Sequence, residues 1–281
     1  MNIRTDMALE AHELSRGEAP EIDGVKVEKK SYGKITRTVV DIINDKGAKA
    51  IGKQTGRYIT IDAPDLKYSL DDYEKVCQLL SEDIKKMCNG KTTLVVGLGN
   101  RAITPDALGC AVVDELVITS HIKKHMPEAL DESYSSVSAI APGVMGTTGI
   151  ETLEIVKGVT EKVNPDTIIA VDALAGADIK RVCTSIQIAD TGIAPGSGIG
   201  NNRDGLNEQS LGVKVIAIGV PTVIAAELIS GNSLPEEFSS VMVTTKDIDL
   251  VIERMSKTVA NGINMALHKN ISFREIEEMV S

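Results

Sequence analysis

The residues of this sequence that could do chemistry are chiefly two aspartates, each placed just after an apolar run. Asp106 follows the run at residues 94–97 across a short loop, and Asp172 lies in the run at residues 167–173. Both runs suit buried parallel strands. Neighbouring strand ends lie about 4.8 Å apart, so the two carboxylates can face one water molecule. Such a pair shares a proton, with one acid acting as base on the water and the other polarising a carbonyl. For each aspartate alone, a helix cap or a strand-end hydrogen-bond acceptor remains an open interpretation.

The loop before Asp106 is rich in glycine and reads Gly97-Leu98-Gly99-Asn100. Backbone can approach a ligand closely in such a turn. Thr104-Pro105-Asp106 predicts a helix start, with Thr104 as N-cap and Pro105 in the first position. Ala102 stands where a dinucleotide fingerprint would need its third glycine, so a structural turn is favoured over a cofactor site. No cofactor is expected.

Two further motifs are weaker evidence for a functional site. The triplet Asp190-Thr191-Gly192 occurs in pepsin-like proteases, but a second copy is absent and the surroundings are α/β. A turn is therefore the favoured interpretation, and a place at the rim of the site is the alternative. His121 and His125 have metal-chelating spacing but lie among lysines without the HExxH glutamate. The four cysteines have no CxxC spacing. No metal site is predicted.

Charge and length narrow the possible classes of function. The chain has 281 residues, 42% of them apolar, and a net charge of −10. This acidic balance disfavours a nucleic-acid surface, which needs clustered Lys and Arg. There is no apolar run long enough for a bilayer and no signal peptide, so we expect a cytoplasmic protein without a membrane partner.

The order of predicted elements indicates an α/β fold. Residues 1–19 show a weak helical stripe, and residues 20–64 form a small β-rich section, either an antiparallel extension of the main sheet or a subdomain. From residue 70 strands alternate with helices, including a helix opened by Pro221 and a long one over 247–268. This alternation predicts a mostly parallel sheet with helices on both faces.

Five motifs, spread in order over nearly the whole chain, resemble those of the germination proteases of endospore-forming bacteria. They are residues 4–11, residues 96–100 with 104–109, residues 141–149, residues 171–175 and residues 190–198. The resemblance implies an atypical aspartic endopeptidase, usually tetrameric and made as a zymogen. It implies that the enzyme starts the degradation of small acid-soluble spore proteins in the spore core on germination. The family's two essential aspartates correspond to Asp106 and Asp172, and its fold is similar to that of hydrogenase maturation proteases.

The resemblance also predicts a role for the N-terminal residues. Family substrates are cut after the acid of a Thr-Glu pair that is followed by an apolar-Ala-Ser-Glu pattern. Residues 5–10 read Thr-Asp-Met-Ala-Leu-Glu, a close imitation. We therefore predict self-cleavage between Asp6 and Met7, which gives a propeptide of residues 1–6 and a single protease domain of residues 7–281. A merely disordered terminus is the other interpretation.

A cut after an acidic residue requires a cationic contact. Arg101 and Arg203, in the two glycine-rich loops, are the candidates, with Lys180 and Arg181 as alternatives. Backbone N–H groups in the same loops are expected to bind the substrate's oxyanion; they come from residues 97–100, including Gly99 and Asn100, or from residues 196–200, including Gly198. Two other functions remain open: a hydrogenase-maturation-like peptidase that senses a metal, and a non-catalytic module that binds a phosphate ligand.

Overall fold

The computed structural model describes residues 5–17, 21–69, 71–194, 204–231, 240–269 and 271–280. The strands within them are β1 (Val25–Tyr32), β2 (Ile35–Ile42), β3 (Gly56–Asp62), β4 (Thr92–Gly97), β5 (Ser136–Ile140), β6 (Thr167–Gly176), β7 (Ser185–Ala189), β8 (Lys214–Ala225) and β9 (Met242–Val243). The α-helices are α1 (Ala8–Arg16), α2 (Asp45–Ile51), α3 (Tyr73–Met87), α4 (Leu108–Asp114), α5 (Ser120–His125), α6 (Met145–Thr148), α7 (Thr152–Val163), α8 (Glu208–Leu211), α9 (Ala226–Ser230), α10 (Ile248–Leu267) and α11 (Phe273–Val280). Two short 3₁₀ helices are η1 (Thr104–Asp106) and η2 (Pro127–Ala129).

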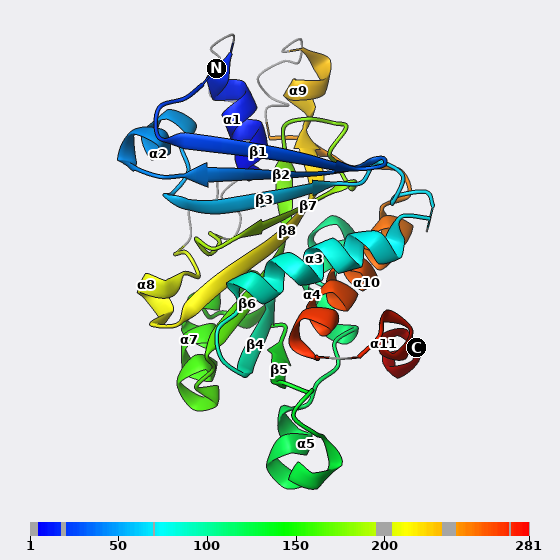
Figure 1. The fold of residues 1–281 in the computed structure, drawn as a ribbon. Coiled ribbons are helices and arrows are strands. Elements are labelled where there is room, and N and C mark those ends of the chain that lie inside the picture. The colour runs from blue at the N-terminus through cyan, green and yellow to red at the C-terminus, as the bar shows by residue number, and fades with distance from the viewer. Residues whose placement is uncertain are drawn as a thin grey trace.

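These strands form one mixed sheet in the order β1-β2-β3-β7-β8-β6-β4-β5, with β9 beside β8 (Figure 1). Strands β8, β6, β4 and β5 pair in parallel, as alternating strands and helices predict. Strands β1, β2, β3 and β7 pair antiparallel and join the parallel half at β8. The predicted α/β class is confirmed, and the β-rich section of residues 20–64 is an antiparallel extension of the main sheet.

Helices cover both faces of the sheet. On one face α3 and α10 pack side by side in front of the strands (Figure 1). Their apolar side chains form one core cluster with alternate strand residues such as Val39, Ile188 and Ile218. The residues between these, such as Val40 and Ala189, face the opposite side, where α1 covers one part and α7 another.

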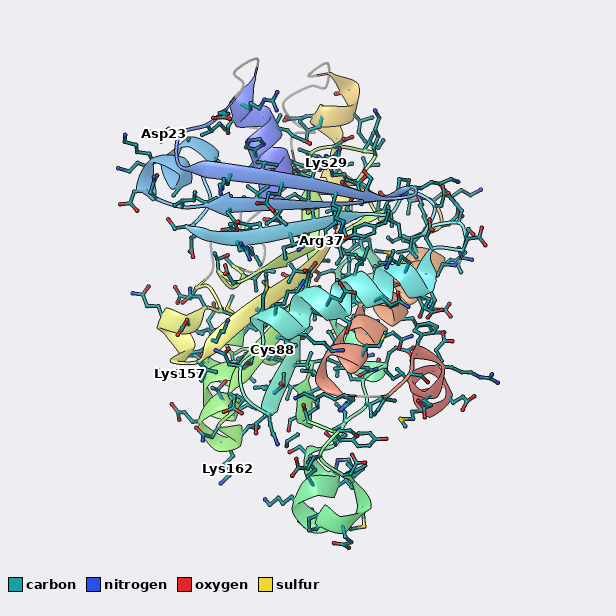
Figure 2. The ribbon with its side chains drawn as sticks, in the orientation of Figure 1. Asp23, Lys29, Arg37, Cys88, Lys157 and Lys162 are labelled. Carbon is teal, nitrogen blue, oxygen red and sulfur yellow. The ribbon has the colours of Figure 1, made fainter. Side chains whose placement is uncertain are left out.

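An ion pair fastens α3 to the antiparallel half of the sheet. Arg37 of β2, labelled in Figure 2, donates from Nε and Nη2 to the carboxylate of Asp83 on α3, at 2.6 and 2.7 Å. The Asp83 side chain is only 2% exposed. A two-pronged contact of this kind satisfies a buried carboxylate that would otherwise be costly.

Several predicted elements are confirmed and two are wrong. The weak stripe near the N-terminus is α1, and the long helix over 247–268 is α10. Pro221 does not open a helix, because β8 continues to Ala225. The register against β6 skips Thr222, so the proline lies next to a β-bulge, where a strand tolerates it. Thr104 does not cap an α-helix; it begins the 3₁₀ turn η1, and α4 starts at Leu108.

Within the residues described above, no helix is long and apolar enough to cross a membrane.

Candidate active site

Asp172 lies on β6, on the face of the sheet that carries α1 and α7. Its side chain is 5% exposed, and its Oδ1 accepts the N–H of Ala173 at 2.9 Å. Burial raises the pKa of this carboxyl well above its usual value, and the negative charge of Asp106 raises it further. Asp172 therefore keeps a proton at pH values where an ordinary aspartate has lost it.

Asp106 is held beside this acid by the turn that follows β4. The N–H of Leu98 donates to Val171 O at 2.8 Å, which ties the start of the turn to β6. The N–H of Asn100 donates to Asp106 Oδ2 at 2.8 Å, so the turn closes on the carboxylate itself. Asp106 and Asp172 both line one cavity of about 390 Å³. The structure thus brings the two predicted aspartates to one site.

The β-bulge in β8 supports the same turn from the other side. Thr222, the residue that the register skips, donates its hydroxyl to Pro105 O at 2.7 Å. Pro105 directly precedes Asp106 in η1. No local sequence pattern predicts this contact, because it depends on how β8 is aligned with β6.

Gly99 makes the turn possible. Its φ of +102° favours glycine, and a Cβ there would lie 1.9 Å from Asp106 O. The side chain of Asn100 accepts the N–H of Ala102 at 3.0 Å. Gly99 and Asn100 therefore shape the turn that carries Asp106, while their proposed contacts with substrate remain a prediction.

The N-terminal segment lies against the same site. The N–H of Asp6 donates to Ala175 O at 2.9 Å, and the N–H of Ala175 donates to Asp6 Oδ2 at 2.8 Å. Asp6 and Asp172 line both the 390 Å³ cavity and a second one of about 270 Å³. Met7 and Ala8 are fully buried. Residues 5–8 thus cross the candidate site in a well-defined conformation.

Lys53 is a cation of this site that the sequence did not single out. It follows α2 directly after Gly52, lines the 270 Å³ cavity, and donates from Nζ to Thr5 O at 2.8 Å. Burial lowers the pKa of Lys53, and the charges of Asp6 and Glu10 oppose that shift. A lysine in a loop carries no pattern from which such a role could be predicted.

The predicted substrate-binding arginines are placed differently. Arg101 is exposed and pairs with Asp114 of α4. Its predicted contact with an acidic substrate residue stays a prediction. Arg203 and Gly198 lie outside the described residues. Of the alternatives, Arg181 binds the carboxylate of Glu13 at 2.6 and 2.8 Å.

The other motifs occupy structural positions. His121 and His125 lie on the short helix α5, and the described part of the chain has no group of three or more His, Cys, Asp or Glu placed to hold a metal ion. Asp190 Oδ1 accepts the N–H of Arg57 at 2.8 Å, a contact between β3 and the end of β7. This contact agrees with the turn role favoured for the Asp190 triplet.

A pair of acids in a cavity that a segment of peptide also lines is typical of a hydrolase that acts on peptides. A sequence model described as germination protease matches residues 3–238. The germination protease of Clostridium perfringens is 42% identical over 100% of this chain and 99% of its own. That of Caldanaerobacter subterraneus is 41% identical over 100% and 98%, and that of Bacillus velezensis 36% over 96% and 94%. The chain therefore belongs to the germination protease family and is a peptidase of spore germination.

Among solved structures, a [NiFe] hydrogenase maturation protease, HycI from Thermococcus kodakarensis, is similar with a TM-score of 0.40 and 17% identity. The match covers 66% of this chain and 98% of that one.

Proposed function

We propose that this chain is a zymogen of the germination endopeptidase that begins the degradation of small acid-soluble spore proteins in the spore core. In this proposal it cuts after an acidic residue by means of Asp106 and Asp172. It also cuts its own chain between Asp6 and Met7, releasing residues 1–6. One observation carries the proposal: Asp6, the residue before the proposed cut, lines the cavity of the acid pair and also a second cavity that Asp172 lines.

The contacts of the N-terminal segment agree with binding as a substrate. One main-chain bond, from Asp6 N–H to Ala175 O, and one bond from Ala175 N–H to the Asp6 carboxylate join the bound segment to β6. Adding an extended peptide to a strand is a common way to bind peptides of varied sequence. The Asp6 carboxylate then occupies the position of the acid after which the enzyme cuts. It is recognised by a backbone N–H and by the neighbouring charge of Lys53.

Each residue described below, on the C-terminal side of the proposed cut, is buried or bonded by the protein in its own way. Met7 and Ala8, the apolar and alanine positions of the substrate pattern, are fully buried. Glu10, the acidic position, is 2% exposed, and its carboxylate accepts the N–H groups of Ala177 at 2.6 Å and Asp178 at 3.0 Å. The two backbone N–H donors favour a carboxylate at this position, whereas burial raises the pKa of Glu10.

The acid pair supplies the proposed chemistry. Asp172, whose pKa is raised by burial and by the charge of Asp106, holds the proton of the pair. Asp106 acts as base on the attacking water, and Asp172 gives its proton to the leaving nitrogen. We include the family's tetramer in the proposal as the working assembly.

Incubation of the purified chain with a small acid-soluble spore protein tests the proposal. We expect one early cut after an acidic residue, located by mass spectrometry, and a mature N-terminus at Met7. Asp106→Asn and Asp172→Asn should each abolish both cuts while the protein remains folded. Substantial cleavage by either variant would rule out the acid pair, and a different mature N-terminus would rule out the Asp6–Met7 site. Light scattering of the chain tests the tetramer.

A further inference from the structure

Gln187 is a buried amide side chain in the same row of the sheet as Asp172. It lies on β7 and pairs with Gly219 of β8, and Gly219 pairs on its other side with Asp172 of β6. Residues that pair across adjacent strands point to the same face of a sheet. Gln187 and Asp172 therefore stand on one face, about 10 Å apart at their Cα atoms, or two strand spacings. All three residues line the 270 Å³ cavity.

The residue in the middle of this row is Gly219, which lines the cavity without a side chain of its own. Any side chain at Gly219 would occupy the space between the two polar residues, and its Cβ would lie 2.5 Å from the side chain of Leu174. The row thus holds an acid and an amide on either side of a glycine, against which the Leu174 side chain packs. The segment around Asp6 and Met7 lies across this row.

Both ends of the Gln187 side chain bind the N-terminal segment. Its Nε2 donates to Asp6 O at 3.3 Å, and its Oε1 accepts the N–H of Ala8 at 2.7 Å. Asp6 O is the carbonyl oxygen of the Asp6–Met7 peptide. The side chain is 7% exposed, so the amide exchanges few contacts with water.

We propose that Gln187 is a catalytic residue of this peptidase, whose Nε2–H stabilises the oxyanion that forms on the carbonyl of the residue before the cut. The proposal rests on the proposed function, because it takes the Asp6–Met7 peptide as the bound substrate. The Oε1 contact with the second N–H after that carbonyl fixes the peptide's orientation.

The step balances with the groups present. Asp106 takes a proton from water while the water oxygen bonds to the carbonyl carbon, and the C=O pair moves onto the oxygen that Gln187 contacts. The pair then returns, the C–N bond breaks, and the nitrogen takes the proton of Asp172. The products are a carboxylic acid and an amine, and the proton passes from Asp106 back to Asp172.

Neighbouring backbone donors are engaged elsewhere. The N–H of Leu98 donates to Val171 O, and that of Asn100 donates to Asp106. The N–H of Ala173 donates to Asp172 Oδ1. The Leu98 and Asn100 donors thus hold the turn that positions Asp106 and the Ala173 donor holds Asp172, whereas Gln187 already donates to the Asp6 carbonyl.

The rate of self-cleavage of the full chain tests the assignment. We compare wild type, Gln187→Met, which has similar volume but no amide, and the matched control Gln78→Met on the exposed side of α3, where Gln78 bonds only Glu74 within its own helix. Loss of one oxyanion donor typically slows the chemical step about 100- to 1,000-fold. We expect that loss for Gln187→Met and the wild-type rate for Gln78→Met. Intact mass over time gives the rate constant.

A second measurement separates chemistry from docking. Limited proteolysis reports whether residues 5–17 remain bound, as the contacts of Asp6 and Glu10 predict. A docked segment that is cut at least 100-fold more slowly supports the catalytic role. A rate less than 100-fold below that of wild type overturns it, and so does a segment that has come away, because Gln187 would then act by docking alone. Should Gln187→Met fail to fold, Gln187→Glu, which keeps an acceptor for Ala8, is judged by the same criteria.

The same experiment distinguishes failure of the proposed function from failure of the role proposed for Gln187. A wild-type chain that cuts neither itself nor a small acid-soluble spore protein overturns the proposed function and this assignment with it. A wild-type chain that cuts both, together with a Gln187→Met chain that cuts as fast, overturns the assignment alone.

Discussion

Replacement of Asp172 by asparagine is expected to change how the stability of the protein depends on pH. The side chain is 5% exposed, and burial and the charge of Asp106 raise the pKa of its carboxyl well above the usual value. An aspartate in the unfolded chain titrates near pH 3.9, at about its reference pKa. Between that pH and the folded pKa, the folded protein holds a proton that the unfolded chain has released. The free energy of unfolding therefore falls as pH rises, by about 1.4 kcal/mol per pH unit.

Asparagine at position 172 removes the titration of this side chain and can keep its hydrogen bond. Its Oδ1 can still accept the N–H of Ala173, and the amide is neutral at every pH in the range. We expect the free energy of unfolding of the variant, relative to that of wild type, to rise by about 1.4 kcal/mol for each pH unit above 4, until the folded pKa of Asp172 is reached. Above that pKa, the difference in the free energy of unfolding between the two proteins stays constant. Other titrating groups are present in both proteins and largely cancel in the difference.

Urea unfolding at half-unit steps from pH 4 to pH 8, followed by circular dichroism, measures the difference. Asp249→Asn, an exposed Asp-to-Asn change on α10, is measured in parallel as the matched control. A stability difference between wild type and Asp172→Asn that does not vary between pH 4 and 7 would refute the raised pKa. The assignment of Asp172 as the proton donor would then fail as well.

Two further changes test the supports of the site and of the fold. Thr222→Val removes the hydroxyl that donates to Pro105 O at 2.7 Å, so we expect a loss of about 1 kcal/mol in the free energy of unfolding and slower peptide cleavage. Cleavage at the wild-type rate would show that the bulge does not position Asp106. Arg37→Met leaves the carboxylate of Asp83, 2% exposed, without its two-pronged partner, and we expect a loss of about 3 kcal/mol in urea unfolding. A loss below 1 kcal/mol would mean that water or Lys86, 3.8 Å away, replaces the arginine.

The sequence was informative where chemistry follows a local pattern. An apolar run with an acid at its end is a short-range signal, so Asp106 and Asp172 could be identified and expected to meet. The parallel half of the sheet could be predicted for the same reason, because strands and helices alternate along the chain. The pairing of residues 20–64 with β7 remained open, because antiparallel register between distant segments leaves no mark in either segment.

The remaining parts of the site depend on register and on loops. Thr222 reaches the turn of Asp106 only because β8 carries a bulge beside Pro221, and proline alone favoured a helix start. Gln187 could have been noticed as a polar residue within the buried strand Ser185–Ala189, but its partners are contributed by the N-terminus. Lys53 follows a helix end, where a lysine is ordinarily solvated.

The burial of Glu10 has a consequence for the cut enzyme. None of the contacts that hold this segment depends on the Asp6–Met7 bond: the Glu10 carboxylate accepts the N–H groups of Ala177 and Asp178, and α1 packs on β2 and β3. Under the proposed function, the surface that binds the substrate residues after the cut is therefore already occupied by Glu10 and α1, which remain covalently attached to the enzyme. Such a ligand has an effective concentration in the mM range. Incoming spore proteins must outcompete it, so release of α1 becomes a control on activity that is separate from cleavage itself.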